Sequence, residues 1–177
     1  MTRQRPWVLV VAVAVLTAAV YAQQPKRTPD IHYTPTRQNV AEAMLNLAGV
    51  TKDDVVYDLG SGDGRLPILA AQLFGARGVG IEIDSKLVAL SRANARDAGV
   101  GDWVTFIEGD LFTADISAAT VVTLYLSRSV LRDLQPKLKS ELRPGTRIVS
   151  HQFWIDGWPA EQTIRVDASE IFLLQVK

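Results

Sequence analysis

The stretch "DLGSGDGR", which begins at Asp58, combines residue types and spacings that suit ligand binding. Gly60, Gly62 and Gly64 alternate with other residues, so the backbone can turn tightly and approach a ligand without an intervening Cβ. Asp58 and Asp63 add two carboxylates beside these glycines. The following residues predict a helix, whose first N–H groups would be free to bind a phosphate or a carboxylate. We therefore interpret the stretch as a ligand-binding loop.

The spacing of the glycines and acidic residues narrows the choice of ligand. The dinucleotide fingerprint is G-x-G-x-x-G, whereas this chain has G-x-G-x-G, and a pair of carboxylates would repel a pyrophosphate but not an amino group. Glu82 lies 22 residues after Gly60, at a predicted strand end where an acidic side chain accepts hydrogen bonds from ribose hydroxyls. Asp110 can accept a hydrogen bond from an adenine amine, with Leu111 and Phe112 supplying apolar contacts. S-adenosylmethionine matches these features and NAD does not.

Alternating strand-like and helical segments would position these residues. Short apolar runs predict strands, and apolar residues at helical spacing predict the helices between them. The expected strands are 54–59, 78–83, 103–110, 119–126 and 146–153, followed by two more in the tail ("EQTIRV" and "EIFLLQV"). The expected helices are 37–48, 65–74, 85–99 (with Ser85 as its cap) and 129–142.

This order predicts an α/β fold with a doubly wound, mostly parallel seven-stranded sheet. Helices should cover both faces, and the two final strands should form a C-terminal antiparallel hairpin. Because such sheets bind ligands above the carboxyl ends of their strands, we expect Asp58, Glu82 and Asp110 to lie around one site.

Composition excludes several kinds of chemistry. The chain has 177 residues, enough for one domain with a substantial core, and its 19 basic residues balance 19 acidic ones. This balance argues against nucleic-acid binding through bulk charge. There is no cysteine, and the two histidines, His32 and His151, are far apart, so we expect neither thiolate chemistry nor a metal site.

The first residues form the three-part pattern of a secretory signal peptide. Arg3 and Arg5 precede an uncharged run over 7–21, and small residues then allow cleavage after Ala22. Two alternatives stay open: either the run is an uncleaved membrane anchor, or the true start codon lies further along the chain.

These interpretations divide the chain into a signal peptide or anchor (1–22), a polar tether (23–30) and one folded domain (31–177). If the signal is used, we expect an exported protein, periplasmic or otherwise extracytoplasmic, with a membrane anchor if the signal is not cleaved. A cytoplasmic protein is expected if the start is misassigned.

Over residues 31–177 the chain resembles the class I, seven-β-strand methyltransferases. Within them it is similar to small protein-lysine methyltransferases, which include archaeal broad-specificity enzymes and the enzyme that methylates the ATP-synthase c-subunit. The motifs that carry this resemblance are "HYTPT", "VVYDLGSGDGR", "GARGVGIEID", "GDLF", "ATVVTLYL" and "PKLKSELRPGTRIVSHQF".

The resemblance implies a set of residues around S-adenosylmethionine. They are Asp58, Gly60 and Gly62 at the methionine end, Glu82 at the ribose, Asp110 at the adenine, and Tyr33 and Thr36 closing over the cofactor. Tyr125 would face the transferring methyl group as the catalytic residue, and His151 would be structural rather than a base. The alternatives are that Tyr33 only packs against the first helix and that Tyr125 is a wall residue without a chemical task.

The implied activity is methylation of lysine side chains of a protein partner by a monomeric enzyme. The loop "SRSV" after the fourth strand departs from the expected pattern, which leaves the acceptor open. A small-molecule methyltransferase with the same cofactor site is one alternative. An exported, non-catalytic domain that binds a ligand or protein is another, because S-adenosylmethionine is made in the cytoplasm.

Overall fold

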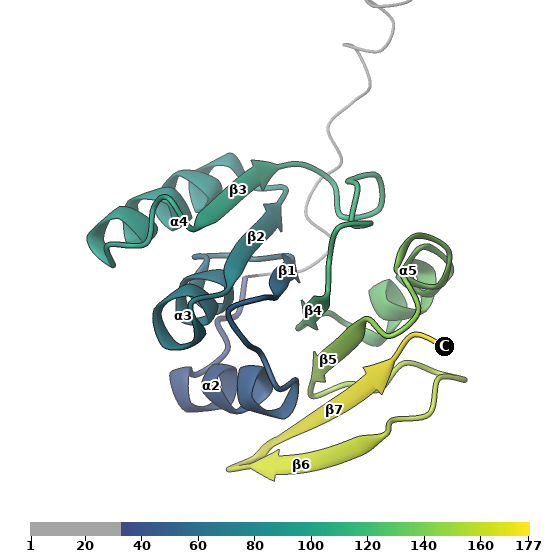
Figure 1. Ribbon diagram of the computed structural model, residues 1–177. Helices are drawn as coiled ribbons and strands as arrows, with labels where there is room; N and C mark the ends of the chain where they lie inside the picture. The colour runs from purple at the N-terminus through teal and green to yellow at the C-terminus, as the bar shows by residue number, and fades with distance from the viewer. Residues whose placement is uncertain (1–32) are drawn as a thin grey trace, which may run out of the picture.

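The computed structural model describes residues 33–177 as one sheet covered by helices (Figure 1). The expected signal peptide or anchor and the tether lie outside the described residues. The sheet has seven strands in the order β3-β2-β1-β4-β5-β7-β6. The strands are β1 (Val55–Leu59), β2 (Arg77–Glu82), β3 (Val104–Glu108), β4 (Val121–Leu124), β5 (Arg147–His151), β6 (Gln162–Val166) and β7 (Ser169–Gln175). The helices are α2 (Gln38–Leu47), α3 (Arg65–Phe74), α4 (Ser85–Asp97) and α5 (Arg128–Glu141).

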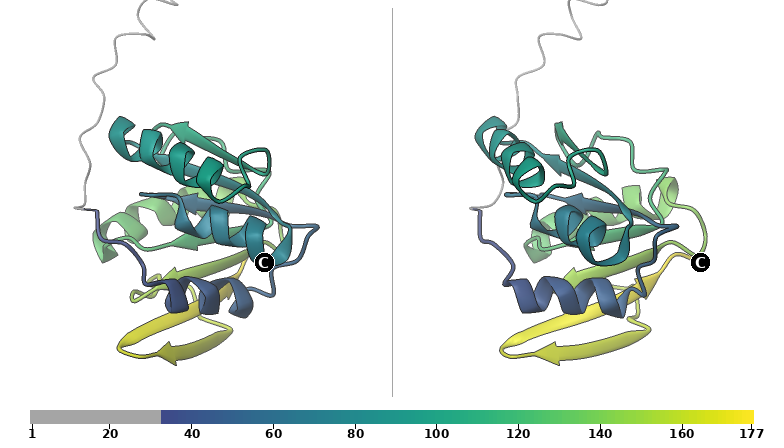
Figure 2. Two further views of the ribbon diagram at one scale, coloured as in Figure 1. Left: turned by 90° about the vertical axis from the view of Figure 1, so that its left-hand side faces the viewer. Right: turned by 60° about the vertical axis from the view of Figure 1, so that its left-hand side comes forward.

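The pairing of the strands confirms the expected topology. Strands β1 to β5 are parallel neighbours, and β7 inserts antiparallel between β5 and β6. The hairpin β6–β7 forms the end of the sheet away from α4 (Figure 2). Strand order reverses between β1 and β4, so the loops that follow these two strands open a crevice at their carboxyl ends.

Alternating side chains on the central strands divide the core into two layers. Val56 and Val121 pack with apolar residues of α2 and α3, whereas their neighbours Tyr57 and Val122 pack with apolar residues of α5. All four residues of β4 are buried, as its continuous apolar character predicts. Both faces of the sheet are therefore covered, as expected (Figure 1).

The predicted elements differ from the observed ones mainly at their ends. Helix α4 is capped by Asp84, whose side chain accepts a hydrogen bond from the Lys86 backbone N–H at 2.8 Å. The prediction of Ser85 as the cap is wrong because Ser85 is already the first helical residue, while Asp84 has an extended backbone. No helix within residues 33–177 is long and apolar enough to cross a membrane.

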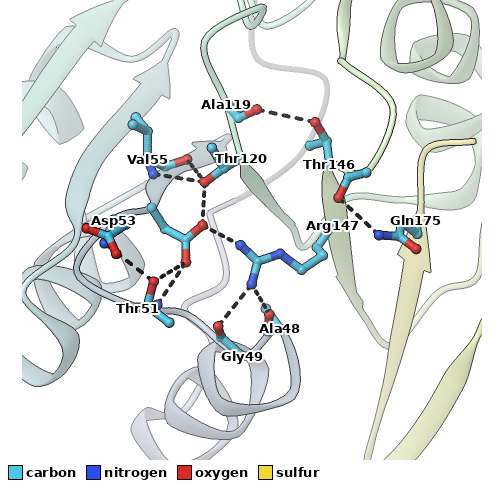
Figure 3. A network of polar contacts seen from close by, with 12 residues as sticks. Ala48, Gly49, Thr51, Asp53, Val55, Ala119, Thr120, Thr146, Arg147 and Gln175 are labelled. Carbon is cyan, nitrogen blue, oxygen red and sulfur yellow. Dashed lines mark hydrogen bonds and ion pairs between the residues drawn. The ribbon is translucent and has the colours of Figure 1, made fainter.

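A network of polar contacts lies at the amino ends of the central strands (Figure 3). Asp54, which directly precedes β1, accepts hydrogen bonds from Thr120 Oγ1 at 2.7 Å and Thr51 N at 2.8 Å, and it forms an ion pair with Arg147. Arg147 also donates to the carbonyl oxygens of Ala48 and Gly49, at 2.6 and 2.9 Å, after α2. This network joins the end of α2 to β1, β4 and β5.

Candidate cofactor and acceptor site

A pocket of about 510 Å³ lies at the carboxyl ends of the strands on either side of the reversal point. It is lined by nine of the residues that the sequence pattern or the family resemblance implies for the site, but not by Phe112. The nine residues are Tyr33, Thr36, Asp58, Gly60, Gly62, Glu82, Asp110, Leu111 and Tyr125. The structure therefore brings the ends of β1, β2, β3 and β4 together around one pocket. The contacts of each residue indicate what it can do there.

The glycine loop adopts a backbone that other residues rarely adopt. Gly60 and Gly62 have φ values of 82° and 54°, in the left-handed region. Both Gly60 N and Ser61 N donate to the Ile81 carbonyl oxygen, at 2.9 and 3.0 Å, so the loop lies against the end of β2. At Gly62 an added Cβ would lie 2.4 Å from Cε2 of Tyr33, because the Tyr33 ring packs directly on this glycine.

Asp58 is a buried carboxyl group with few partners that favour its charge. Its side chain accepts a hydrogen bond from Thr123 Oγ1 at 2.7 Å. Burial raises the pKa of Asp58 to about 7; the Thr123 hydrogen bond lowers it, and the nearby charges of Glu82 and Asp63 raise it further. A positively charged ligand group beside Asp58 would stabilise its ionised form.

The Glu82 carboxylate accepts hydrogen bonds from the glycine loop and from the turn that follows β2. Its Oε2 accepts a hydrogen bond from Gly62 N at 2.9 Å, and its Oε1 accepts from Ile83 N and Asp84 N at 2.8 and 3.0 Å. A carboxylate offers about four acceptor positions, so Glu82 keeps capacity for a ligand hydroxyl while it holds the glycine loop in place.

Asp63 does not act as a second free carboxylate of the loop. Arg65 Nε donates to Asp63 Oδ1 at 2.9 Å, and Arg65 Nη2 donates to Oδ2 at 2.6 Å. Burial would raise the pKa of Asp63, but the hydrogen bonds and charge of Arg65 lower it overall. The charge of Asp63 still raises the pKa of Asp58, but its ion pair with Arg65 leaves Asp58 as the stronger candidate to bind a cationic ligand group.

The third strand end contributes Asp110 and Leu111 to the pocket. Asp110 Oδ1 accepts a hydrogen bond from Phe112 N at 2.9 Å, which fixes the turn after β3. Phe112 does not line the pocket; it is half-buried and packs against the core cluster that includes residues of α5. The structure therefore does not bring Phe112 into the pocket beside Leu111, and its contact with the base stays a prediction.

Ser61 and Phe153 also line the pocket, although neither was predicted from the sequence. Ser61 lies between two glycines, and within residues 33–177 its buried Oγ has no hydrogen-bond partner. Phe153 follows Gln152, which has a left-handed φ of 70° at a bend after β5. A glycine neighbour gives some indication of Ser61, but no local pattern predicts a left-handed glutamine.

The polar groups of the pocket match those of S-adenosylmethionine. An amino group would satisfy buried Asp58, a ribose hydroxyl would use the remaining capacity of Glu82, and a polar ligand atom would satisfy Ser61 Oγ. The left-handed glycines let the backbone approach the ligand closely. No group of three or more acidic or histidine side chains in the described part of the chain is arranged to hold a metal ion.

The strand order, the glycine loop and the acidic strand ends together define a class I S-adenosylmethionine-dependent methyltransferase. The model of the ANTKMT methyltransferase domain family matches residues 58–162, and the chain belongs to this family.

Relatives with solved structures or curated names agree with this class. A protein-lysine N-methyltransferase of Saccharolobus islandicus is 45% identical over 78% of this chain and 87% of its own length. The mouse adenine nucleotide translocase lysine N-methyltransferase is 35% identical over 82% of this chain and 65% of its own length. A solved structure from Salinibacter ruber is described as an RNA methyltransferase in complex with S-adenosyl-L-homocysteine. Its sequence is 52% identical to this chain, and the two structures superpose with a TM-score of 0.80 over 81% of this chain and 94% of that chain.

Proposed function

We propose that this methyltransferase transfers the methyl group of S-adenosylmethionine to lysine side chains of a protein substrate. The observation that carries the proposal is the division of the pocket into two chemical halves. Asp58, Glu82 and Asp110 lie at the first three parallel strands, while Tyr125, Leu126 and Phe153 line the half formed after β4 and β5. The first half suits the polar ends of the cofactor, and the second suits an aliphatic side chain.

The bound cofactor would supply an electrophilic methyl group on a sulfonium, which is the difficult part of the chemistry. We assign Asp58 to the methionine amino group, Glu82 to the ribose, and Asp110 with Leu111 to the adenine. Gly60 and Gly62 allow close approach, and Tyr33 and Thr36 cover the ligand. The task of these residues is to hold the donor in one orientation, so that the nucleophile meets it in line.

A lysine amine must lose its proton before it can act as a nucleophile. Burial in an apolar environment lowers the pKa of an amine, and the residues that line the acceptor half (Tyr125, Leu126, Ser127, Val130 and Phe153) carry no charge. We assign Tyr125 to contact the incoming amine and exclude water. The lowered pKa leaves more of the amine unprotonated, so no dedicated base is needed.

RNA methylation is a second candidate, favoured by the similarity to the Salinibacter ruber protein described as an RNA methyltransferase. Four of the 19 basic residues and one of the 19 acidic residues lie in 1–32, so residues 33–177 have a formal charge of −3. RNA-binding domains normally carry a basic excess, which favours a protein acceptor. Small-molecule methylation would use the same cofactor residues.

The test uses the full chain, S-adenosylmethionine with a labelled methyl group, and a cell extract freed of small molecules. We expect label that protease removes, that ribonuclease leaves, and that amino-acid analysis recovers as methyl-lysine, with no label when Asp58→Asn is used. Label removed by ribonuclease, or label that enters only added small molecules, would contradict a lysine acceptor.

We also propose that the N-terminal pattern directs export. A C-terminal fusion to a reporter that is active only outside the cytoplasm tests this proposal. Activity of a reporter that works only inside the cytoplasm would contradict export and place the enzyme in the compartment where its cofactor is made.

A further inference from the structure

His151, at the end of β5, contacts two parts of the site that are far apart in the sequence. Its Nδ1 lies 3.2 Å from Oγ1 of Thr36, and its ring stacks on Tyr125 with centroids 4.0 Å apart and planes inclined by 32°. The side chain is buried, and the steps assigned above do not use it.

The first contact anchors the segment Tyr33–Thr36, which we call the N-terminal strap. Thr36 is buried, and its carbonyl oxygen accepts a hydrogen bond from Arg65 Nη1. At the other end of the strap, the Tyr33 ring packs on Gly62. The Thr36 side chain is held by His151 and its backbone by Arg65, so the strap is fixed at Thr36 beside the cofactor half of the pocket.

The second contact supports the acceptor half. The backbone of His151 is held in the sheet by pairing with Ile171 of β7. Immediately after it, Gln152 has a left-handed φ, and Ser150 Oγ donates to the Phe153 carbonyl oxygen at 2.5 Å. The imidazole at the end of β5 therefore lies against the Tyr125 ring, and Phe153, two residues further along the chain, lines the pocket.

We infer that His151 is a positioning residue whose nitrogen holds the N-terminal strap over the cofactor and whose ring holds Tyr125 at the acceptor. The inference rests on the proposed function, because it assigns the two halves of the pocket to donor and acceptor. Burial lowers the pKa of His151 to about 4, so the ring is neutral at pH 7 and places no positive charge near a sulfonium.

Two substitutions at His151 separate its two contacts. His151→Phe keeps a flat ring beside Tyr125 but removes the nitrogen, whereas His151→Asn keeps a polar group near Thr36 but removes the ring. The full chain is titrated calorimetrically with S-adenosylmethionine, and methyl transfer to protein is timed at saturating cofactor. His151→Phe should weaken cofactor binding about fivefold, which is the effect of losing one neutral hydrogen bond. His151→Asn should slow methyl transfer about tenfold, while its cofactor affinity should change by less than about twofold.

Thr36→Val provides a matched variant on the other side of the hydrogen bond. Alone it should also weaken binding about fivefold, and in combination with His151→Phe it should add nothing, because both remove the same interaction. Additive effects would overturn the link between Thr36 and His151. Thermal unfolding is measured for every variant.

The remaining outcomes are also distinguishable. If His151→Phe and His151→Asn reduce binding and transfer equally, in step with their melting temperatures, His151 is merely structural and the inference fails. Normal cofactor binding and transfer by both variants would overturn it too. A wild-type chain that binds no S-adenosylmethionine would overturn the proposed function and the inference together.

Discussion

Asp54 and Asp58 lie four residues apart, at opposite ends of β1, and their surroundings differ sharply although both are buried. Burial would raise the pKa of Asp54, yet the hydrogen bonds from Thr120 and Thr51 and the charge of Arg147 lower it overall. Asp58 receives one side-chain hydrogen bond, from Thr123, and the charges that act on it are acidic.

This difference separates the structural end of the sheet from the functional end. At the amino end, Arg147 pairs with the buried carboxylate of Asp54 and also donates to the Ala48 carbonyl oxygen. These contacts stabilise the junction of α2 with the sheet. At the carboxyl end it leaves a buried carboxyl group that a cationic ligand can stabilise. Substitutions at the two ends should therefore affect different properties.

The largest effect is expected for Asp58→Asn. Loss of a charge-assisted hydrogen bond to the amino group should weaken S-adenosylmethionine binding by about 100-fold or more, measured by calorimetry. The free energy of unfolding in urea should stay constant or rise, because the variant removes a poorly solvated charge. A variant that binds the cofactor normally would remove Asp58 from the site.

The matched change at the other end is Arg147→Met. It leaves Asp54 without its ionic partner, so the free energy of unfolding should fall by about 2 kcal/mol in urea titrations. Cofactor affinity at 25 °C should change by less than about twofold. If affinity fell while stability did not, the separation of the two ends would be contradicted.

The two aspartates should also respond oppositely to pH. For Asp58 the folded pKa of about 7 exceeds the ordinary 3.8, so the unfolded chain releases its proton first. The contribution of Asp58 to stability therefore decreases as pH rises from about 4 to about 7. For Asp54 the folded pKa is lowered, so its contribution is present above the ordinary value and is lost as pH falls through the folded pKa.

Cofactor binding makes the pH response of Asp58 measurable. Because an amino group favours the ionised form, affinity for S-adenosylmethionine should fall by up to about tenfold for each pH unit below 7. Asp58→Asn should abolish this slope, whereas Asp54→Asn should keep it. Calorimetric titrations at pH 5.5, 6.5 and 7.5 compare the three chains, and an unchanged slope in Asp58→Asn would assign the titration to another group.

The smallest effect is expected at Tyr33, which is 45% exposed. Tyr33→Ala removes the ring that packs on Gly62 and should weaken cofactor binding about threefold, while Tyr33→Phe keeps the ring and should stay within about twofold. Equal losses in both variants would show that the hydroxyl group matters rather than the ring.

Local patterns in the sequence predict the fold and the members of the site well. Gly60, Glu82 and Asp110 lie at the ends of separate predicted strands, and the topology of a parallel sheet brings these ends together. Local patterns are therefore sufficient to predict these three positions, whereas Tyr33, Thr36 and Tyr125 were implied only by the family resemblance.

The features that were missed depend on contacts between distant or irregular segments. Thr36 and His151 are 115 residues apart, so their contact has no trace in local spacing. Gln152 has a positive φ that no residue preference indicates, and the next residue, Phe153, lines the pocket. The pairing of Asp63 with Arg65 is local, but charge counting alone cannot tell a neutralised carboxylate from a free one.

The central claim is that the buried carboxyl group of Asp58 binds the amino group of the cofactor. A crystal structure of the full chain with S-adenosyl-L-homocysteine measures the distance between these groups directly. We predict a distance of about 2.8 Å from the Asp58 carboxylate to the ligand nitrogen, with the ribose hydroxyls at Glu82. A ligand whose amino group lies away from Asp58, with no other cation beside that carboxylate, would contradict it.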